Sequence, residues 1–229
     1  MRAPVSVVIP TLGAAGRLGA CVEALGEGLM SGLVRELVIA DGGSADGIEA
    51  VAGALGARLV TAPRGRGAQL AAGARAAEGA WLLFLHADTV LAPGWAAAVQ
   101  AHIAARPERA GYFALRFDRT GPMPRIVAGW ANLRSALGLP YGDQGLLVSR
   151  EVYGATGGHP EIPLMEDVAL ARRLGRRRLA RLDGAAVTSA ARYAAEGWIR
   201  RGARNLSTLA LYLTGVAPER LVRHYERGG

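Results

Sequence analysis

The sequence predicts an α/β fold in which a mostly parallel sheet is flanked by helices. Over about the first ninety residues, short apolar runs alternate with segments whose apolar residues recur at helical spacing, a pattern typical of alternating strands and helices. The chain has 229 residues, 51% hydrophobic and 20% charged, which is enough to bury a substantial core. Polar residues follow the predicted strands, at the edge of a parallel sheet where ligands bind.

The first part of the chain justifies the parallel sheet element by element. Apolar and β-branched runs predict strands at residues 5–9, 33–40, 58–61 and 81–85. Helical spacing predicts helices at residues 17–29, 47–55 and 67–77. Strands that alternate with helices at this spacing predict a parallel sheet with helices on both faces.

The second part of the chain is more mixed. We expect a helix after Pro93 and further helices at residues 124–137 and 165–174. Strands are predicted at residues 112–117, 146–149, 179–182 and 186–187. From about residue 194 the pattern predicts a tail of one or two amphipathic helices.

Composition limits the function classes. The formal net charge is +8, but all 27 basic residues are arginines, and together with the abundant alanine this indicates a GC-rich coding bias rather than a polyanion-binding protein. The densest basic run, residues 172–178, has no interleaved aromatic residues, which disfavours nucleic-acid binding. Cys21 is the single cysteine, which excludes a disulfide framework. No run suits a signal peptide or a membrane span, so a cytoplasmic protein is expected.

One glycine-rich motif indicates a different class of protein. Gly13, Gly16 and Gly19 follow the first strand, and Asp41 ends the second, which resembles a dinucleotide-binding fingerprint. However, Pro10-Thr11-Leu12 separates the strand from the first glycine, which should lie directly at the strand end. The chain also has no lysine for the Tyr and Lys pair of short-chain reductases. The sequence therefore disfavours a nicotinamide-dependent reductase.

Four segments, taken in order, carry a more specific signal. They are Val5–Leu12 (VSVVIPTL), Glu36–Gly47 (ELVIADGGSADG), Leu82–Thr89 (LLFLHADT) and Pro163–Leu170 (PLMEDVAL). Together they resemble the family-2 nucleotide-diphosphosugar glycosyltransferases of the GT-A type, and residues 197–216 are similar to a small bacterial subgroup of it. The resemblance implies a Rossmann-like GT-A fold and transfer of a sugar, with inversion, from a UDP- or GDP-linked donor to a hydroxyl acceptor.

The same resemblance divides the chain. It implies a single glycosyltransferase domain over residues 1–229, with a nucleotide-binding half at about 1–92, an acceptor and catalytic half at about 93–190, and a helical tail at about 191–229. Such enzymes use a divalent metal, Mn²⁺ or Mg²⁺, which carboxylate oxygens hold and which neutralises the departing diphosphate.

Asp88 is the expected metal ligand, because it stands at the end of an apolar strand. The family's motif there is Asp-x-Asp, whereas this chain has His86 at the first position. The site therefore offers one carboxylate where the family has two, with His86 as a further ligand or as an orienting group. The alternative is that Asp88 only caps the turn before Pro93.

The resemblance also assigns donor contacts. They fall on Pro10, Thr11, Asp41, Arg64, Arg66, Gln69, Ala87, Asp88 and Arg192. Arginine suits phosphate oxygens, although the same arginines could simply be solvated, and Asp41 could be a turn residue. The family has Asn and an acidic residue after the Pro-Thr pair, and this chain has Gly13-Ala14 instead.

Two adjacent carboxylates open the predicted helix at residues 165–174. Side chains of neighbouring helical residues point about 100° apart, so only one can face a cleft. By resemblance that one is Asp167, acting as the general base that takes the proton of the acceptor hydroxyl. Asp143, Gln144 and Glu166 are assigned to the acceptor side. The alternatives are a plain turn at residues 142–145 and an acid that stabilises the helix dipole.

Other readings stay open. A catalytically inactive nucleotide-sugar-binding protein would explain His86 in place of an acid, and a nucleotidyltransferase would share the sheet and the metal. The acceptor is unknown. The arginine-rich second half and the amphipathic tail permit a lipid-linked acceptor and peripheral contact with the inner face of a membrane, while helix packing or a homodimer explains the same apolar stripe.

Overall fold

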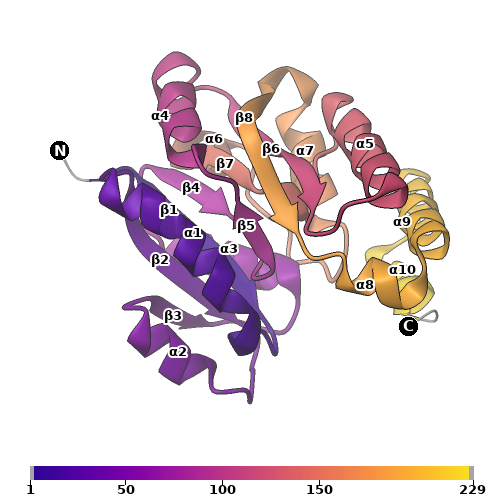
Figure 1. The fold of residues 1–229 in the computed structure, drawn as a ribbon, viewed down its shortest axis with the longest axis horizontal. Helices are drawn as coiled ribbons and strands as arrows, with labels where there is room; N and C mark the ends of the chain where they lie inside the picture. The colour runs from indigo at the N-terminus through magenta and orange to yellow at the C-terminus, as the bar shows by residue number, and fades with distance from the viewer. Residues whose placement is uncertain (1–2, 227–229) are drawn as a thin grey trace.

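The computed structural model describes residues 3–226. Within them, the chain forms an eight-stranded mixed sheet with helices on both faces (Figure 1). The strands are β1 (Val5–Thr11), β2 (Val34–Asp41), β3 (Arg58–Thr61), β4 (Trp81–Phe84), β5 (Thr89–Leu91), β6 (Ala110–Phe117), β7 (Leu146–Ser149) and β8 (Leu179–Thr188). Their order across the sheet is β3-β2-β1-β4-β7-β6-β8-β5.

The helices alternate with these strands in the first half and gather in the tail. The α-helices are α1 (Leu18–Met30), α2 (Ile48–Ala54), α3 (Arg66–Ala76), α4 (Trp95–Ala105), α5 (Pro122–Ala136), α6 (Arg150–Ala155), α7 (Glu166–Leu174), α8 (Ala191–Glu196), α9 (Trp198–Leu213) and α10 (Pro218–Glu226). Short 3₁₀ turns are η1 (Ala15–Arg17), η2 (Gly142–Gln144) and η3 (Arg176–Arg178). No described helix is long and apolar enough to cross a membrane.

The first half of the sheet matches the prediction. β3, β2, β1 and β4 run parallel to one another, with helices between them as the apolar periodicity indicated. The second half is mixed, because β7 runs antiparallel to both β4 and β6, and β5 runs antiparallel to β8. The α/β prediction is confirmed, and the departure from a mostly parallel sheet is confined to this second half.

Three elements differ from the sequence prediction. β5 has three residues and α6 has six, too few for either hydrophobic period to stand out. The two short strands predicted at residues 179–187 are one strand, β8. Its pairing with β6 shifts register between Tyr112 and Ala114. Asp183 and Gly184, which interrupt the apolar pattern, lie at this irregularity, so the strand continues past them.

Two apolar layers enclose the sheet. Successive side chains of β1 point to opposite faces of the sheet. Val7 and Ile9 therefore lie in the layer under α1, α2 and α4, whereas Val8 lies in the layer under α3 and α7. Helix α3 approaches the sheet very closely, because a Cβ at Gly73 would lie 2.4 Å from Val8 Cγ1. Its run of small residues is therefore a packing requirement.

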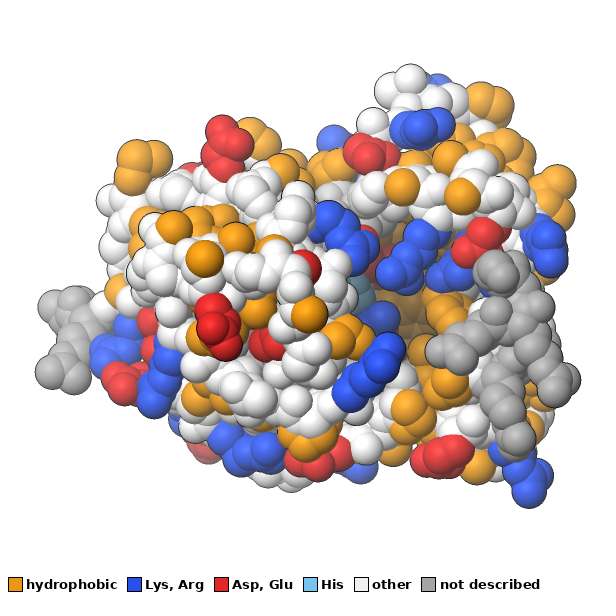
Figure 2. All heavy atoms as spheres, turned by 90° about the horizontal axis from the view of Figure 1, so that it is seen from below, with side chains coloured by type: hydrophobic (Ala, Val, Ile, Leu, Met, Phe, Trp, Pro, Cys, Tyr) orange, Lys and Arg blue, Asp and Glu red, His pale blue; other side chains and the backbone are white. Residues whose placement is uncertain are grey.

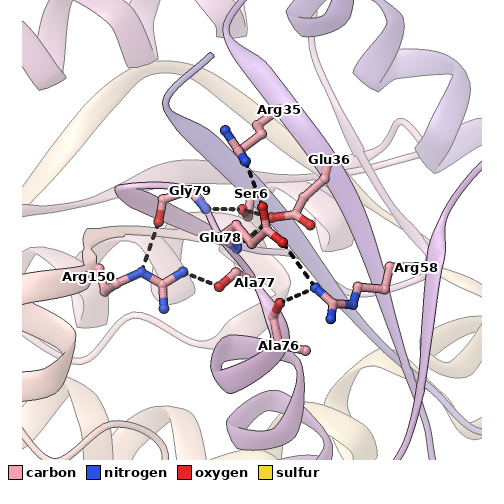
Figure 3. Close-up of polar contacts among 9 residues, drawn as sticks. All are labelled: Ser6, Arg35, Glu36, Arg58, Ala76, Ala77, Glu78, Gly79 and Arg150. Carbon is pink, nitrogen blue, oxygen red and sulfur yellow. Dashed lines mark hydrogen bonds and ion pairs between the residues drawn. The ribbon is translucent and has the colours of Figure 1, made fainter. Parts of the chain in front are cut away.

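A polar network joins the amino ends of β1, β2 and β3 to the end of α3 (Figure 3). The guanidinium of Arg150 donates to the carbonyl oxygens of Gly79 at 3.0 Å, Ala74 at 3.3 Å and Ala77. Arg150 therefore satisfies the carbonyls that the end of a helix leaves without partners.

Acidic side chains complete the network. Glu36 accepts from the hydroxyl of Ser6 at 2.5 Å and from the amide of Glu78 at 2.6 Å, and Glu78 pairs with Arg35 at 2.6 Å and Arg58 at 3.6 Å. These contacts all lie at the amino ends of the parallel strands, which leaves the carboxyl ends free for a site.

Candidate active site

A cleft opens at the carboxyl ends of β1 and β4, and it holds two adjoining cavities. Figure 2 looks into this hollow, where arginine side chains stand at the rim and histidine and acidic side chains lie deeper. The outer cavity, of about 510 Å³, is lined mainly by the chain that follows β1, β3 and β4. The inner cavity, of about 130 Å³, lies toward α7, α8 and α9.

Six residues border both cavities. They are Arg66, His86, Asp88, Leu164, Arg192 and Tyr225. The outer cavity adds the expected Pro10, Thr11, Arg64, Gln69 and Ala87. The inner cavity adds Asp143 and Asp167. The structure thus brings together residues from three of the four sequence segments, Val5–Leu12, Leu82–Thr89 and Pro163–Leu170, which lie up to about 160 residues apart.

Asp167 is held by backbone amides. Its Oδ2 accepts from the Gly142 amide at 2.8 Å and its Oδ1 accepts from the Val168 amide at 2.7 Å. Met165, just before α7, has a positive φ of 67°, the one non-glycine residue of the described chain with this strained conformation. Strain of this kind collects at functional sites, and here it sets the direction in which α7 starts.

Gln144 anchors the turn that supplies the Gly142 amide. Its side chain is fully buried and makes hydrogen bonds with the Phe113 carbonyl at 3.0 Å and the Ser135 hydroxyl at 2.5 Å. It does not line either cavity. The structure therefore puts Gln144, which the sequence assigned to the acceptor side, beneath the turn rather than in the cleft.

Asp143 projects into the inner cavity from the same turn. Burial, together with the neighbouring Asp167 and Asp88 carboxylates, raises the pKa of Asp143 to about 6, although Arg134 acts in the opposite direction. Its Oδ1 has no hydrogen-bond partner among the described residues. The inner cavity therefore holds a carboxylate that is poorly satisfied and costly to ionise.

Glu166 points away from Asp167, as the 100° spacing predicts. It is buried and lies 3.4 Å from the Arg66 guanidinium, and it does not line either cavity. Burial raises the pKa of Glu166 to about 7, and the charge on Arg66 opposes that rise. Glu166 thus positions Arg66 at the junction of the two cavities rather than facing the cleft itself.

Asp41 does not line either cavity. Its carboxylate accepts from Thr11, from the amide of Gly43 and from both the amide and the hydroxyl of Ser44, at 2.5–2.9 Å. Burial alone would raise the pKa of Asp41, but these hydrogen bonds outweigh it and lower the pKa. Its side chain stabilises the turn after β2. This is the alternative to a donor contact that the sequence analysis gave for Asp41.

Gln69 joins the same two strand ends. Its amide donates to the carbonyl oxygens of Thr11 and, at 3.1 Å, Ala40. A Cβ at Gly42 would lie 3.0 Å from Gln69 Nε2, so the turn after β2 leaves little space beside it. Gln69 lines the outer cavity while its amide group fixes the shape of that cavity's floor.

The residues that could hold a metal are few. The described residues contain no group of three His, Cys, Asp or Glu side chains arranged for a metal ion. His86 is half-buried, and its buried Nε2 has no hydrogen-bond partner among the described residues. A Cβ at Gly142 would lie only 2.4 Å from that nitrogen. Burial and the charges of Arg66 and Arg192 lower the pKa of His86 well below its usual value, which favours the neutral ring.

Asp88 alone nevertheless fits one kind of metal site. Mg²⁺ is commonly held by one or two carboxylates, with substrate phosphates and water filling its other positions. Asp88 borders both cavities, so a phosphate bound between them would meet this carboxylate. The chain offers a shared site that depends on substrate rather than a cage built from protein ligands.

Tail residues complete the cleft, and the sequence did not single them out. Tyr193, Arg201 and Asn205 line the inner cavity, and Tyr225 of α10 borders both cavities. Arg201 is buried, pairs with Glu196 at 3.0 Å and donates to the Tyr225 hydroxyl. No local motif marks these positions, because only the folding of the tail across the cleft brings them there.

Comparison with known proteins agrees with this architecture. The family model described as glycosyl transferase family 2 matches residues 6–134. No curated protein sequence matches the chain. A structure of glucosyl-3-phosphoglycerate synthase from Mycobacterium tuberculosis, with Mn²⁺, UDP-glucose and glycerol 3-phosphate, is 25% identical, with a TM-score of 0.58, and the match covers 78% of this chain and 69% of that chain.

Two more solved structures share the fold. The same synthase with Mn²⁺, UDP and glucosyl-3-phosphoglycerate is 23% identical, with a TM-score of 0.59 over 81% of this chain and 70% of that chain. TarS of S. aureus, residues 1–349 with UDP-GlcNAc, is 15% identical, with a TM-score of 0.61 over 81% of this chain and 58% of that chain. The family match spans more than half of the sequence, and the chain therefore belongs to glycosyl transferase family 2 and has its GT-A fold.

Proposed function

We propose that this glycosyltransferase moves a sugar, with inversion, from a UDP- or GDP-linked donor to a hydroxyl acceptor, assisted by Mn²⁺ or Mg²⁺. The observation that carries the proposal is that Asp88 and Asp167 border one inner cavity. Asp88 lines both the inner and the outer cavity, and Asp167, at the start of α7, lines the inner one. This arrangement suits a reaction with a leaving group on one side and a nucleophile on the other.

The donor fits the outer cavity. Its volume of about 510 Å³ is within the range of small-molecule sites. Arg66 and Arg192 border both cavities, and guanidinium groups bind phosphate oxygens in a bidentate way. We therefore assign the diphosphate to the junction of the cavities and the base to the outer cavity, within the half formed by residues 1–92. The solved relatives that contain UDP support this choice of donor class.

Asp88 would hold the metal beside the diphosphate. A divalent cation there supplies positive charge that stabilises the diphosphate as the glycosidic bond breaks. The solved relatives contain Mn²⁺ or Mg²⁺. We assign His86 an orienting role, because its neutral ring is packed against the turn at Gly142.

Asp167 acts as the base. It removes the proton of the acceptor hydroxyl, whose oxygen attacks the anomeric carbon on the face opposite the diphosphate. A single displacement of this kind inverts the anomeric configuration. The two backbone amides that bond to Asp167 hold its carboxylate in one orientation.

The rest of the chain supplies the acceptor side. Asp143 and the tail residues Arg201 and Asn205 line the inner cavity, so we assign acceptor contacts to residues 93–190 and to the tail. Glu166 contributes indirectly, by pairing with Arg66. A hydroxyl acceptor would donate to Asp143, whose Oδ1 is without a partner among the described residues.

One observation favours an inactive nucleotide-sugar-binding protein. His86 stands where the family's metal motif has a carboxylate, and the described residues form no three-ligand metal site. A binder of this kind would retain the outer cavity and lose turnover. We favour the enzyme because binding alone would not require the strained backbone that precedes Glu166 and Asp167.

Calorimetric titration tests the proposal. The purified protein is titrated with UDP, GDP and dTDP, with and without Mn²⁺, beside the Asp88→Ala variant. We expect Mn²⁺-dependent binding of one nucleoside diphosphate that is lost in this variant. Asp183→Ala, which removes an exposed carboxylate from β8, is the matched control. If neither metal nor Asp88 affects binding, the proposed metal role is wrong.

Slow hydrolysis of the matching nucleotide sugar then separates the enzyme from the binder. Release of nucleoside diphosphate, measured with water as acceptor, should fall to background in the Asp167→Asn variant while nucleotide binding persists. A binder would give background release in both proteins. A nucleotidyltransferase would instead release pyrophosphate from a nucleoside triphosphate.

A further inference from the structure

Helix α9 buries polar side chains together with Leu209 and leaves an apolar stripe in solvent. Arg201 and Thr208 are buried, and Asn205 lines the inner cavity. On the opposite side, Ile199 is 79% exposed and Leu206 is 49% exposed. Ala203, Ala210 and Leu213 continue this outward stripe, and all three are exposed. An amphipathic helix of a globular protein normally buries its apolar side, so this orientation needs a partner.

Helix α5 carries a second exposed apolar stripe beside the first. Ile126, Trp130, Leu133 and Leu137 recur at intervals of four, three and four residues and are 52–63% exposed, so they share one side of α5. Helices α5 and α9 contact each other, and Figure 1 shows them together at the side of the molecule away from β3. We call these four residues, with Ile199, Leu206 and Leu213, the α5–α9 apolar face.

The charges carried by the two helices of this face have one sign. Neither α5 nor α9 contains an acidic residue, and together they contain five arginines. Arg125 and Arg200 are exposed and flank the two stripes, about 100° from Ile126 and Ile199 respectively. Neither forms an ion pair with a described residue. Just before α5, exposed Arg119 adds a positive charge and the neighbouring exposed Asp118 adds a negative one.

We propose that the α5–α9 apolar face docks on an anionic phospholipid bilayer. Apolar side chains, Trp130 among them, would enter the boundary between headgroups and acyl chains, while the arginines meet lipid phosphates. This combination of an apolar strip with two arginine-bearing helices that contain no acid is what a peripheral membrane helix requires. The inference concerns binding and does not depend on the proposed transferase reaction.

A second copy of the chain suits the face less well. A twofold interface places the same surface of both copies together, so Arg125 and Arg200 would face other arginines. Neither helix supplies an acid to offset that repulsion. An anionic surface complements the same charges, so the charge pattern favours lipid over self-association.

Docking would also orient the cleft. Arg201 and Asn205 line the inner cavity from the side of α9 that faces the protein, while the same helix presents its other side to the lipid. The inner cavity would then lie within one helix diameter, roughly 10 Å, of the headgroups. An acceptor carried by the membrane could approach the cavity from that side.

Vesicle flotation tests the proposal directly. The full chain is mixed with vesicles of phosphatidylcholine alone, or with vesicles that also contain roughly 30% of the anionic lipid phosphatidylglycerol. Each mixture is prepared at low and at high salt. We expect flotation with the anionic vesicles, loss at high salt, and no flotation with the neutral ones. Trp130 is the exposed tryptophan at 56%, whereas Trp81 and Trp95 are buried, so insertion should also shift the tryptophan emission to the blue.

Two variants separate the apolar and charged contributions. Trp130→Ser with Leu206→Ser should weaken partitioning at least about tenfold, since each removes substantial apolar area from the lipid. Arg125→Glu with Arg200→Glu should weaken it at least about 25-fold, from roughly fivefold for each arginine removed. The matched control is Leu29→Ser with Met30→Ser, because these residues are also exposed apolar side chains, at 56% and 87%, but lie at the end of α1.

Three outcomes would overturn the proposal. The first is no flotation with either vesicle. The second is flotation that the control variant lowers as much as the α5–α9 variants do. The third is that analytical ultracentrifugation finds a dimer of the wild type and a monomer of the Trp130 and Leu206 variant. In that case the α5–α9 apolar face would bind a second copy of the chain. Circular dichroism checks that each variant is folded, and the charge-reversal variant, at exposed positions, supplies an independent reading if the serine variant unfolds.

Discussion

The backbone amide of Gly142 donates a 2.8 Å hydrogen bond to the Asp167 carboxylate, joining two segments 25 residues apart in sequence. The turn that supplies this amide precedes β7, and α7 supplies the carboxylate. Gly142 also packs against the ring of His86, which follows β4. Through these two contacts, the turn sets the position of the proposed base relative to the strand end where the proposed metal ligand lies.

Replacing Gly142 with alanine should therefore impair turnover more than nucleotide binding. The added Cβ would lie 2.4 Å from His86 Nε2, so the turn must move and carry its amide away from Asp167. Displacements of about 1 Å can cost roughly 100-fold in rate, and we expect kcat to fall about 10- to 100-fold. Steady-state kinetics and nucleotide titration measure the two effects. Gly154→Ala, where a Cβ meets nothing within 4 Å, should leave both unchanged, and equal behaviour of the two variants would contradict the positioning role.

Replacing Asp167 with asparagine should remove the base and little else. The amide keeps the shape of the side chain but cannot accept the acceptor proton, so kcat should fall by about 10²–10⁴. The dissociation constant of the nucleoside diphosphate should change less than about twofold, since the side chain does not line the outer cavity. Asp183→Asn, an exposed change on β8, is the control. Retention of full activity by Asp167→Asn would assign the base to another residue.

Replacing Asp143 with asparagine should stabilise the protein at high pH. Burial and the nearby Asp167 and Asp88 raise the pKa of Asp143 from 3.8 to about 6. The folded state thus binds this proton more tightly than the unfolded state does, and the associated stability is full below about pH 4 and is lost as the pH rises through about 6.

Thermal unfolding at several pH values checks this linkage. At pH 8 we expect the Asp143→Asn variant to unfold roughly 2–4 °C above the wild type, equivalent to about 1 kcal/mol. The difference should shrink as the pH falls toward 4, where the wild-type carboxyl is neutral too. A gap of the same size at every pH would show that the asparagine acts through packing rather than through charge.

Replacing Arg150 with alanine should destabilise the fold without touching the cleft. Three carbonyl oxygens at and just after the end of α3 would lose their charged donor, at a cost of about 2 kcal/mol and roughly 4–8 °C in melting temperature. Arg75→Ala is the control, because Arg75 and Glu161 form an exposed pair and such pairs contribute under about 1 kcal/mol. Calorimetry compares the melting temperatures of the Arg150→Ala and Arg75→Ala variants. Equal melting temperatures would show that Arg150 does not stabilise the fold by capping α3.

The sequence predicted the parts of the fold that local patterns govern. β3 and β7 have the predicted bounds, because turn residues sharply flank both apolar runs. The carboxyl ends of β1 and β4 do meet at the cleft, since parallel strands share that edge by construction. The antiparallel placement of β7 could not be foreseen, because strand direction in the second half depends on long connections.

Individual side chains were harder to assign. Asp41 and Gln144 have the polarity of site residues, yet both satisfy buried groups that only the folded chain brings near them. Tyr225 and Arg201 line the cleft because the tail folds across it. The spacing of residues along the sequence does not predict that fold. The exposed stripe on α9 was visible as periodicity, but its outward orientation was not, because period alone does not say which side faces the core.

The network around Arg150 and Glu78 has a consequence for protein engineering. It fastens the amino edge of the parallel strands (Figure 3), whereas the proposed donor and metal residues occupy the opposite edge. Most proteins trade robustness against activity because the same residues serve both. Here the sheet keeps the two tasks at separate ends, so substitutions that strengthen the amino edge could raise heat tolerance while leaving substrate selectivity to be altered independently.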